Sequence, residues 1–387
     1  MKNINFRKLA TLSIFCLFFA LFLLIIVFVR YQDMWDHACF ARQMLSGVRP
    51  TAGNFLFYWL VNVFSFFSTK IIPSKISLCF LLAIATTYRY YWSQKKIFEI
   101  VNYGRITEYN YWKPALLSIS LIFAFAIPIP SLLVNKSFYI GNFVPNIWHN
   151  STTIFLFPFA LFLFDLSYKQ LNTFNTRRNI WIALLIFLNI FIKPSYFFVY
   201  VCTFPIFLLI KYHFKKEFWL SIIPSIIGLL LLFIEYWTIY QTTNANIQDS
   251  SSIVFHLFYS YKLTSNLWQL PFALFFSLLF PLCYSLFNIN NLKNNLLFWF
   301  TFFSFLISIL IYFFIGESGP RATHGNFYWQ VVICTWLCYF WALIALIKDI
   351  KEKSLTLKNK ILLSIYMLHV AIGLIYFVKL FVVGNYY

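Results

Sequence analysis

Charged residues are scarce in this chain, and acidic residues are the scarcest of them. Only 11 of the 387 residues are Asp or Glu, 61% are hydrophobic, and mean hydropathy is +0.75. This composition excludes a water-soluble domain, and recurring apolar runs of about 20 residues predict bilayer-spanning helices instead. The net charge of +19 does not indicate a nucleic-acid partner. The lysines and arginines cluster in short gaps between apolar runs, where they set topology and contact anionic membrane lipids.

Cysteine motifs, repeats and linkers are also missing. The seven cysteines form no C-x-x-C pair and no Cys/His metal spacing, so we expect neither a disulfide framework nor a zinc site. No cofactor is predicted; a divalent metal is compatible with the sequence but not indicated by it. The absence of repeats and linkers predicts one transmembrane domain over residues 1–387, without an appended soluble domain.

The apolar runs predict an all-α, polytopic membrane bundle of about 11 spans, with a range of 10 to 12. The first run is too long for a typical signal-peptide core and no small-residue cleavage site follows it, so we expect an uncleaved span. The predicted spans cover 9–29, 114–134, 151–168, 179–192, 196–210, 217–239, 267–287, 296–315, 326–347 and 361–383, with at least one more in 54–92.

The 54–92 region leaves the topology open. If 54–68 is re-entrant or lies shallow and 76–92 crosses, every later basic gap stays on the side of the N-terminus. If both segments cross, the orientation of everything downstream is inverted. Basic residues favour the first arrangement, with the N-terminus in the cytoplasm. The composition, rich in Lys, Asn, Ile and Phe, suggests a bacterial cell (inner) membrane.

The first outer loop, residues 30–53, is where charge first accumulates. Asp33, Asp36 and His37 lie within five residues, and an apolar stripe at helical spacing follows them. We interpret this stretch as a short amphipathic helix on the membrane surface, which would hold the two acids at the lipid–water boundary. There a carboxylate can act as general base on an acceptor hydroxyl. The acids could instead only cap and solvate the helix, and His37 could be an ordinary interfacial polar residue.

Further polar clusters fall on the same, non-cytoplasmic side of the predicted topology. Trp148 could be an aromatic-belt anchor and Asn150 an N-cap, whereas His149 between them has no structural need to be there. Lys193 precedes Pro194 at a helix break, where it could bind phosphate or could be a snorkelling lysine in a turn. A loop at 240–266, with His256 and Lys262, belongs to the same side.

A glycine-rich loop before the 326–347 span completes this set. It carries Glu317, Arg321 and His324 between two strongly apolar runs. Arginine at the headgroup level suits bidentate recognition of a phosphate. Glu317 and Arg321 could also form only an exposed ion pair of little consequence.

These features resemble the polytopic glycosyltransferases of superfamily C (GT-C). The resemblance rests on a cytoplasmic N-terminus, paired acids in the first outer loop, an interfacial helix after them and about ten further spans. Family members usually carry an adjacent or near-adjacent acid pair; here Asp33 and Asp36 are separated by two residues, which leaves open which of them is the base.

The resemblance implies transfer of a sugar from a polyprenyl phosphate or pyrophosphate to a glycan, lipid or protein acceptor. Asp33 or Asp36 would be catalytic. His37, His149, Asn150, Lys193, Glu317, Arg321 and His324 would bind substrate, with the cations stabilising the leaving phosphate.

Two other functions remain open at this point. A surface-polysaccharide polymerase of the O-antigen type also handles lipid-pyrophosphate sugars, but the 240–266 loop has no arginine. A lipid-carrier flippase or transporter would favour internal repeats and helices broken near the bilayer midplane. An outward cavity at the acid pair would indicate a transferase, and a path through the membrane would indicate a transporter.

Overall fold

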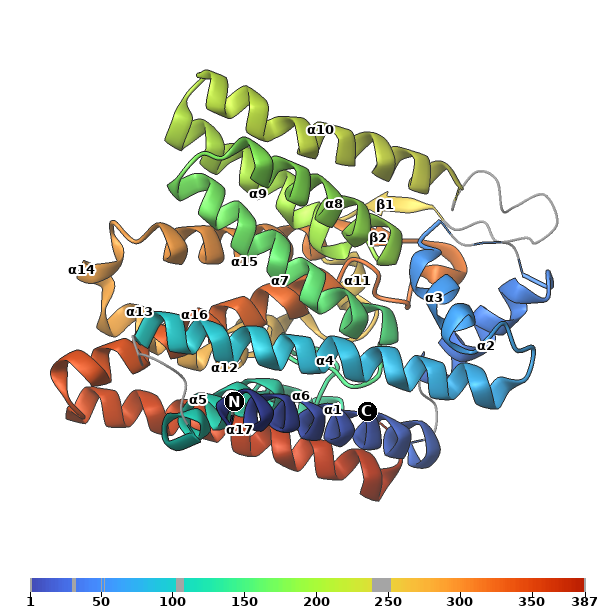
Figure 1. Cartoon of the computed structure of the whole chain (residues 1–387), viewed down its shortest axis with the longest axis horizontal. Helices are drawn as coiled ribbons and strands as arrows, with labels where there is room; N and C mark the ends of the chain where they lie inside the picture. The colour runs from blue at the N-terminus through green and yellow to red at the C-terminus, as the bar shows by residue number, and fades with distance from the viewer. Residues whose placement is uncertain are drawn as a thin grey trace.

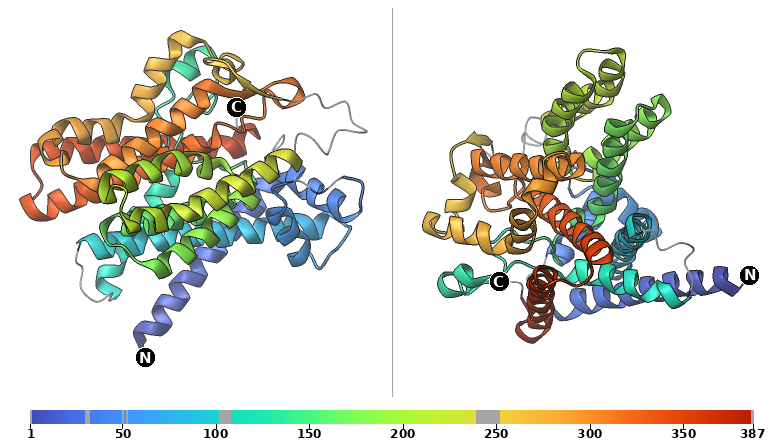
Figure 2. Two further views of the ribbon diagram at one scale, coloured as in Figure 1. Left: turned by 90° about the horizontal axis from the view of Figure 1, so that it is seen from above. Right: turned by 90° about the vertical axis from the view of Figure 1, so that its left-hand side faces the viewer.

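The structure, a computed structural model, describes residues 2–29, 33–49, 51, 53–101, 108–238 and 252–385. Helices make up most of this part of the chain (Figures 1 and 2). The helices are α1 (Lys2–Phe28), α2 (Asp33–Leu45), α3 (Leu56–Phe64), α4 (Ile71–Val101), α5 (Glu108–Phe123), α6 (Ile129–Val134), α7 (Ser151–Asn172), α8 (Thr176–Ile192), α9 (Ser195–Tyr212), α10 (Lys216–Trp237), α11 (Tyr259–Lys262), α12 (Leu270–Ser277), α13 (Leu279–Phe287), α14 (Ile289–Leu292), α15 (Leu296–Phe314), α16 (Trp329–Lys353) and α17 (Leu357–Val383), with 3-10 turns η2 (Leu267–Gln269) and η3 (Gly319–Arg321).

Long apolar helices confirm an integral membrane protein. Within the described residues, eight helices are long and apolar enough to cross a bilayer, or nine if the pair Leu267–Ser277 and Leu279–Phe287, bent by 63°, is one span. The predicted count of about 11 is not confirmed. The difference lies in α8, which has only 17 residues, and in the predicted 114–134 span, which divides into α5 and α6.

The 54–92 region contains one long helix and one short one. Helix α3 has nine residues and is therefore only about 14 Å long, which is too short for a hydrocarbon core of about 30 Å. Helix α4 has 31 residues and easily spans it. The arrangement with one crossing therefore fits the structure, and the arrangement with two does not.

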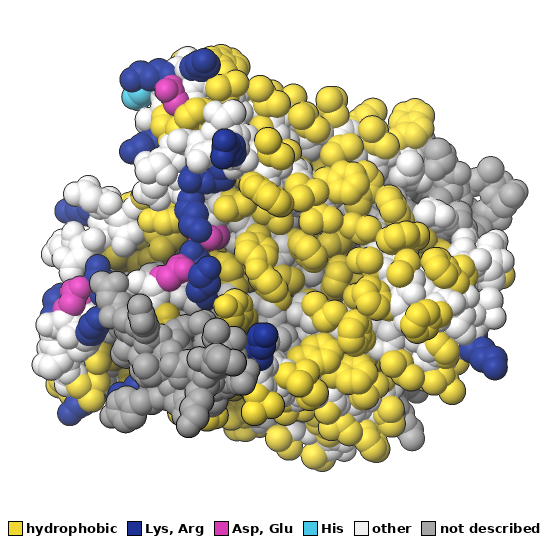
Figure 3. All heavy atoms as spheres, in the orientation of Figure 1, with side chains coloured by type: hydrophobic (Ala, Val, Ile, Leu, Met, Phe, Trp, Pro, Cys, Tyr) yellow, Lys and Arg dark blue, Asp and Glu magenta, His cyan; other side chains and the backbone are white. Residues whose placement is uncertain are grey.

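A large group of basic residues lies at one end of the bundle. Figure 3 shows Lys and Arg side chains gathered at this end, beside a broad apolar belt. Asp165 lies here and pairs with the Lys96 amine at 2.7 Å and the Lys169 amine at 2.9 Å. We call it the basic end; it carries Lys95, Lys96, Lys169, Arg177, Arg178, Lys211, Lys215, Lys216, Lys293, Lys348, Lys351 and Lys353.

The chain between α5 and α6 is irregular inside the bundle. An unpaired backbone group is costly there, because lipid cannot hydrogen-bond it. The Asn146 amide donates to the carbonyls of Leu121 (2.8 Å) and Ala124 (2.6 Å). From α17, the His369 carbonyl accepts from the Phe125 N–H (3.1 Å), and the His369 imidazole Nδ1 bonds the Phe125 carbonyl (2.7 Å). These contacts stabilise the break and give the buried His369 a structural role.

Three local expectations need correction. Of the predicted stripe of α2, formed by Ala38, Ala41, Met44 and Leu45, the first two residues are fully buried in a helix that packs on α3 and α4, and the last two are only partly buried. Trp148 is 4% exposed and packs on Phe377 with ring centroids 4.7 Å apart, which excludes a membrane-interface anchor. A small antiparallel sheet of β1 (Ile253–Phe255) and β2 (Ile315–Glu317) also interrupts the all-α fold.

Candidate active site

A large cavity lies at the end of the bundle opposite the basic end. Its volume is about 1360 Å³, above the range of about 300–1,000 Å³ typical of small-molecule sites. The exposed side chains of Asp36, Arg49 and His324 line it, so it opens to the surface. The cavity is lined by all nine predicted site residues: Asp33, Asp36, His37, His149, Asn150, Lys193, Glu317, Arg321 and His324.

The acid pair occupies the first turn of α2. Carboxylates are favourable there because the helix N-terminus carries unpaired N–H groups and a partial positive charge. Asp33 is half-buried, and its Oδ2 accepts a hydrogen bond from the Asn150 amide at 3.1 Å. Asp36, one turn later, is exposed at the cavity mouth. Partial burial is the larger cause that raises the pKa of Asp36 above its usual range, and the negative charge of Asp33 adds to it.

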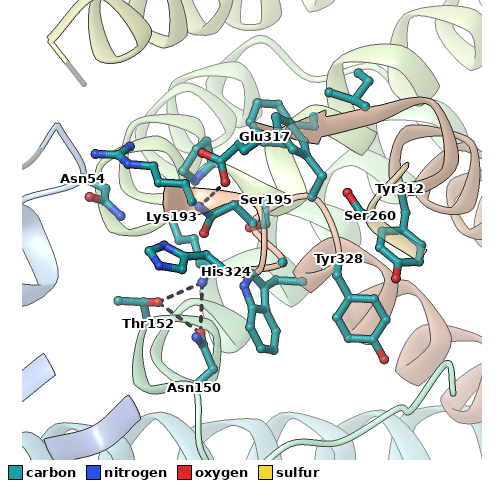
Figure 4. A pocket seen from close by; sticks show the side chains of 18 of the residues that line it. Asn54, Asn150, Thr152, Lys193, Ser195, Ser260, Tyr312, Glu317, His324 and Tyr328 are labelled. Carbon is teal, nitrogen blue, oxygen red and sulfur yellow. Dashed lines mark hydrogen bonds between the residues drawn. The ribbon is translucent and has the colours of Figure 1, made fainter. Parts of the chain in front are cut away.

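Lys193 is held inside the cavity wall by the break between α8 and α9. A residue before proline is driven into extended backbone, and Lys193 has φ −173° and ψ 118°. Its side chain is 7% exposed, which excludes the snorkelling lysine. The amine donates to Asn150 Oδ1 (3.0 Å) and Thr152 Oγ1 (3.1 Å) and lies 4.8 Å from the centre of the Trp329 ring. Figure 4 shows the first two contacts as dashed lines.

Asn150 connects the cation to the acid. Its Oδ1 accepts from the Thr153 N–H at 3.1 Å and so caps α7, as predicted. The same oxygen accepts from Lys193, and the amide nitrogen donates to Asp33. One amide side chain therefore fixes a carboxylate and an ammonium group on the same cavity wall, on elements more than a hundred residues apart in sequence.

Burial controls the charge of the cavity bases. It lowers the pKa of Lys193 to about 7, although the charges of Asp33 and Glu317 oppose the shift. It also lowers the pKa of His149 to about 4, with Asp33 opposing and Lys193 adding to the effect. Burial likewise lowers the pKa of His37 to about 4. The charge of Asp33 opposes this shift, and the charges of Lys193 and Arg49 add to it. Both histidines are therefore neutral near pH 7, whereas Lys193 titrates there.

The glycine-rich loop forms the opposite wall. Strand β2 ends at Glu317, which is 3% exposed and accepts from the Asn326 amide at 2.6 Å. The idea of an exposed Glu317–Arg321 pair is wrong at least for Glu317. Arg321 is half-buried and His324 is exposed. Of the 240–266 loop, His256 and Lys262 are exposed and do not line the cavity, and residues 240–251 lie outside the described part.

A second part of the cavity wall is apolar. Helix α9 contributes Phe198, Val201 and Cys202, and α10 contributes Leu229, Leu232, Phe233 and Tyr236, both at the spacing of a single helix face. Cys202 is seven residues into α9, so the wall reaches about 10 Å along the helix. The cavity thus joins a charged region to an apolar region in membrane-spanning helices, which suits an amphiphilic ligand.

Several lining residues were not predicted as site residues. Tyr58 of α3 bonds His37 Nδ1 through its hydroxyl at 2.8 Å, and Arg49 lies 3.9 Å from the centre of the Phe40 ring. Glu235, near the end of α10, is buried and lines the cavity. The sequence gives Tyr58 no signal, because Tyr58 lies in a largely apolar helix without a charged residue.

In the described ranges, no group of three His, Cys, Asp or Glu side chains is placed to hold a metal ion. Comparison of the chain with models of protein families, with curated proteins and with solved structures finds no match. The functional argument therefore depends on the geometry of the site alone.

Proposed function

We propose that this protein is a membrane glycosyltransferase that moves a sugar from a polyprenyl phosphate or pyrophosphate carrier to an acceptor at the non-cytoplasmic face. The observation that carries the proposal is the Asp33–Asn150–Lys193 chain of hydrogen bonds in the wall of an amphiphilic cavity. In this chain of contacts a carboxylate and an ammonium group lie one amide side chain apart, which supports a base for an acceptor hydroxyl beside a cation for a phosphate.

The reaction is a displacement at the anomeric carbon. The acceptor hydroxyl gives its proton to a carboxylate while its oxygen forms the new bond to that carbon. The bond to the carrier phosphate breaks, and its electron pair stays on the phosphate oxygen. Lys193 and Arg321 offset the developing charge in a partly dry site, where fixed cations act more strongly than in water. His149, Glu317 and His324 then contact the sugar or phosphate.

Asp33 is the better base of the two acids. It accepts from Asn150 and so has a fixed orientation, whereas Asp36 is exposed at the mouth. Positioning matters because a general base must lie within hydrogen-bond reach of the proton that it removes. We assign Asp36, with His37, to the entry of the acceptor.

The position of the cavity supports a transferase over a flippase. Its lining residues come from the end of the bundle opposite the basic end. By the positive-inside rule, that end faces away from the cytoplasm, with the N-terminus inside and the protein in a bacterial cell membrane. A flippase needs access to its substrate from both faces of the membrane, and the described lining of this cavity contains no residue of the basic end.

A polymerase of surface polysaccharide is the second candidate. In that case the acceptor is itself a lipid-pyrophosphate glycan. The observation that favours it is the pair of arginines, Arg49 and Arg321, that line the same cavity from different loops, because two phosphate-bearing lipids require more than one cation.

Loss and complementation of the gene in its host test the proposal. Deletion is expected to remove one glycan linkage, identified by linkage analysis of the purified surface glycan, and the wild-type gene is expected to restore it. Asp33→Asn should fail to restore it at equal protein level, and Glu352→Gln, an exposed site at the basic end, should restore it fully. An unchanged glycan in the deletion strain would overturn the proposed function.

A further inference from the structure

Glu235 is a buried acid that the proposed reaction does not use. It lies in the last turn of α10, is 2% exposed, and lines the cavity. Its cavity neighbours on the same helix, Leu232, Phe233 and Tyr236, are apolar or aromatic. It therefore belongs to the apolar region of the cavity, apart from the chain of contacts that joins Lys193 to Asp33.

The carboxyl group of Glu235 has no partner among the described residues. In the part of the chain that the structure describes, neither of its two oxygens has a hydrogen-bond partner. Lys193, the buried cation of the cavity, is not its hydrogen-bond partner, because the Lys193 amine donates to Asn150 and Thr152. Residues 239–251, which follow α10 in the sequence, include no Lys, Arg or His.

A buried carboxyl group without a partner is costly, and buried polar groups in folded proteins are nearly always paired. The cost is explained when a ligand supplies the missing partner. Since the carboxyl lines the same cavity as Lys193, one ligand can contact both. The parts of α9 and α10 that line this cavity are largely apolar, which suits a ligand with polar groups at separate points.

We propose that Glu235 binds a hydrogen-bond donor of the transferred sugar, either a hydroxyl or an ammonium group, while Lys193 binds the carrier phosphate. This inference rests on the proposed function and deepens it, because it makes Glu235 the residue that selects the sugar. A hydroxyl needs only a hydrogen-bonding partner. An ammonium group needs the negative charge, so a neutral amide distinguishes the two.

The test measures lipid binding to purified full-length protein in nanodiscs by intrinsic tryptophan fluorescence. The probes are polyprenyl phosphate, a polyprenyl-phosphate hexose and a polyprenyl-phosphate aminohexose. The variants are Glu235→Gln and Glu235→Leu. The matched control is Glu217→Leu, the same substitution on the same helix but at the basic end. Thermal melting of each ligand-free protein is measured in parallel.

We expect Glu235→Leu to weaken binding of one sugar-bearing lipid about tenfold, to leave polyprenyl phosphate binding unchanged, and to melt no lower than wild type. If the donor is a hydroxyl, Glu235→Gln stays within about threefold of wild type for the hexose lipid. If it is an ammonium group, Glu235→Gln loses as much affinity as Glu235→Leu, and only for the aminohexose lipid.

Wild-type affinity of Glu235→Leu for all three lipids would overturn the inference, and so would equal losses for all three. A marked fall in melting temperature would do the same, because it would show a structural role. The proposed function fails in a different way, namely if wild-type protein binds none of the three lipids.

Discussion

Lys193 is a buried amine whose charge changes near neutral pH. It lies in the cavity wall close to two acids, Asp33 and Glu317, yet burial outweighs their attraction and lowers its pKa to about 7. An incoming phosphate would restore its proton, because a second negative charge favours the ammonium form. The residue is therefore a cation whose full charge depends on the ligand.

This gives a prediction for pH dependence. Affinity for polyprenyl phosphate should fall as pH rises through about 7. Above that pH the Lys193 amine is mostly neutral, so binding requires the uptake of a proton, and the proton concentration falls with rising pH. His37 and His149 cannot produce this change, since burial lowers the pKa of each to about 4. Titration of binding between pH 6 and 9 measures it.

Lys193→Arg is the matched variant, because a guanidinium keeps its charge over this range. Its binding should be nearly independent of pH from 6 to 9, while Lys193→Met should bind weakly throughout. A wild-type profile that is flat, or that Lys193→Arg reproduces, would contradict the assignment of Lys193 as the phosphate cation.

At the scale of elements, the break between α5 and α6 packs closely against α17. Gly373 of α17 lets the broken segment approach closely, because a Cβ built at this position would lie 1.5 Å from the Phe123 carbonyl oxygen. This carbonyl belongs to backbone that cannot move without disturbing the contacts of Asn146 and His369 with the same segment.

Gly373→Ala should therefore destabilise the protein by about 1–3 kcal/mol, the usual cost of overpacking a core. Melting of the purified protein in detergent tests this. The control is Ala371→Val, an exposed position two residues earlier on α17, which should melt like wild type. Equal melting of Gly373→Ala and wild type would show that the segment can move away.

Some elements could be predicted from sequence and others could not. Pro194 predicts the helix break at which Lys193 is buried, because proline restricts the backbone of the residue before it. Pro128 and Pro130 also mark the break in the 114–134 run, but the run remains apolar on both sides and looks like one span. Strand β2 directly continues α15, and its pairing with β1 connects residues 62 positions apart, such as Val254 and Gly316.

At the scale of the whole molecule, the predicted spans assign the nine predicted residues to one end of the bundle, and all nine line the same cavity. Each predicted cluster follows or precedes a crossing that brings the chain back to the same end, so the sequence predicts a shared face. It does not predict distances within that face. Contacts such as that of His37 with Tyr58, or the burial of the Glu235 carboxyl in the cavity wall, depend on lateral packing of helices, which hydropathy does not encode.

The orientation in the membrane makes a separate prediction. In intact cells, Thr323→Cys at the cavity end should react with a membrane-impermeant maleimide, and Thr173→Cys at the basic end should react only after lysis. Both positions are exposed, and the unsubstituted chain, with its seven cysteines, gives the background. Labelling of Thr173→Cys from outside would place the cavity on the cytoplasmic side and contradict the topology.

The central claim is that the acids beside the first span carry out the transfer. The most direct measurement is the rate at which purified protein transfers a labelled sugar from its polyprenyl carrier, compared between wild type, the double variant Asp33→Asn with Asp36→Asn, and Glu352→Gln. We expect the double variant to lose about 100-fold or more while melting as wild type does, and Glu352→Gln to keep full activity. Full transfer by a normally folded double variant would contradict the account.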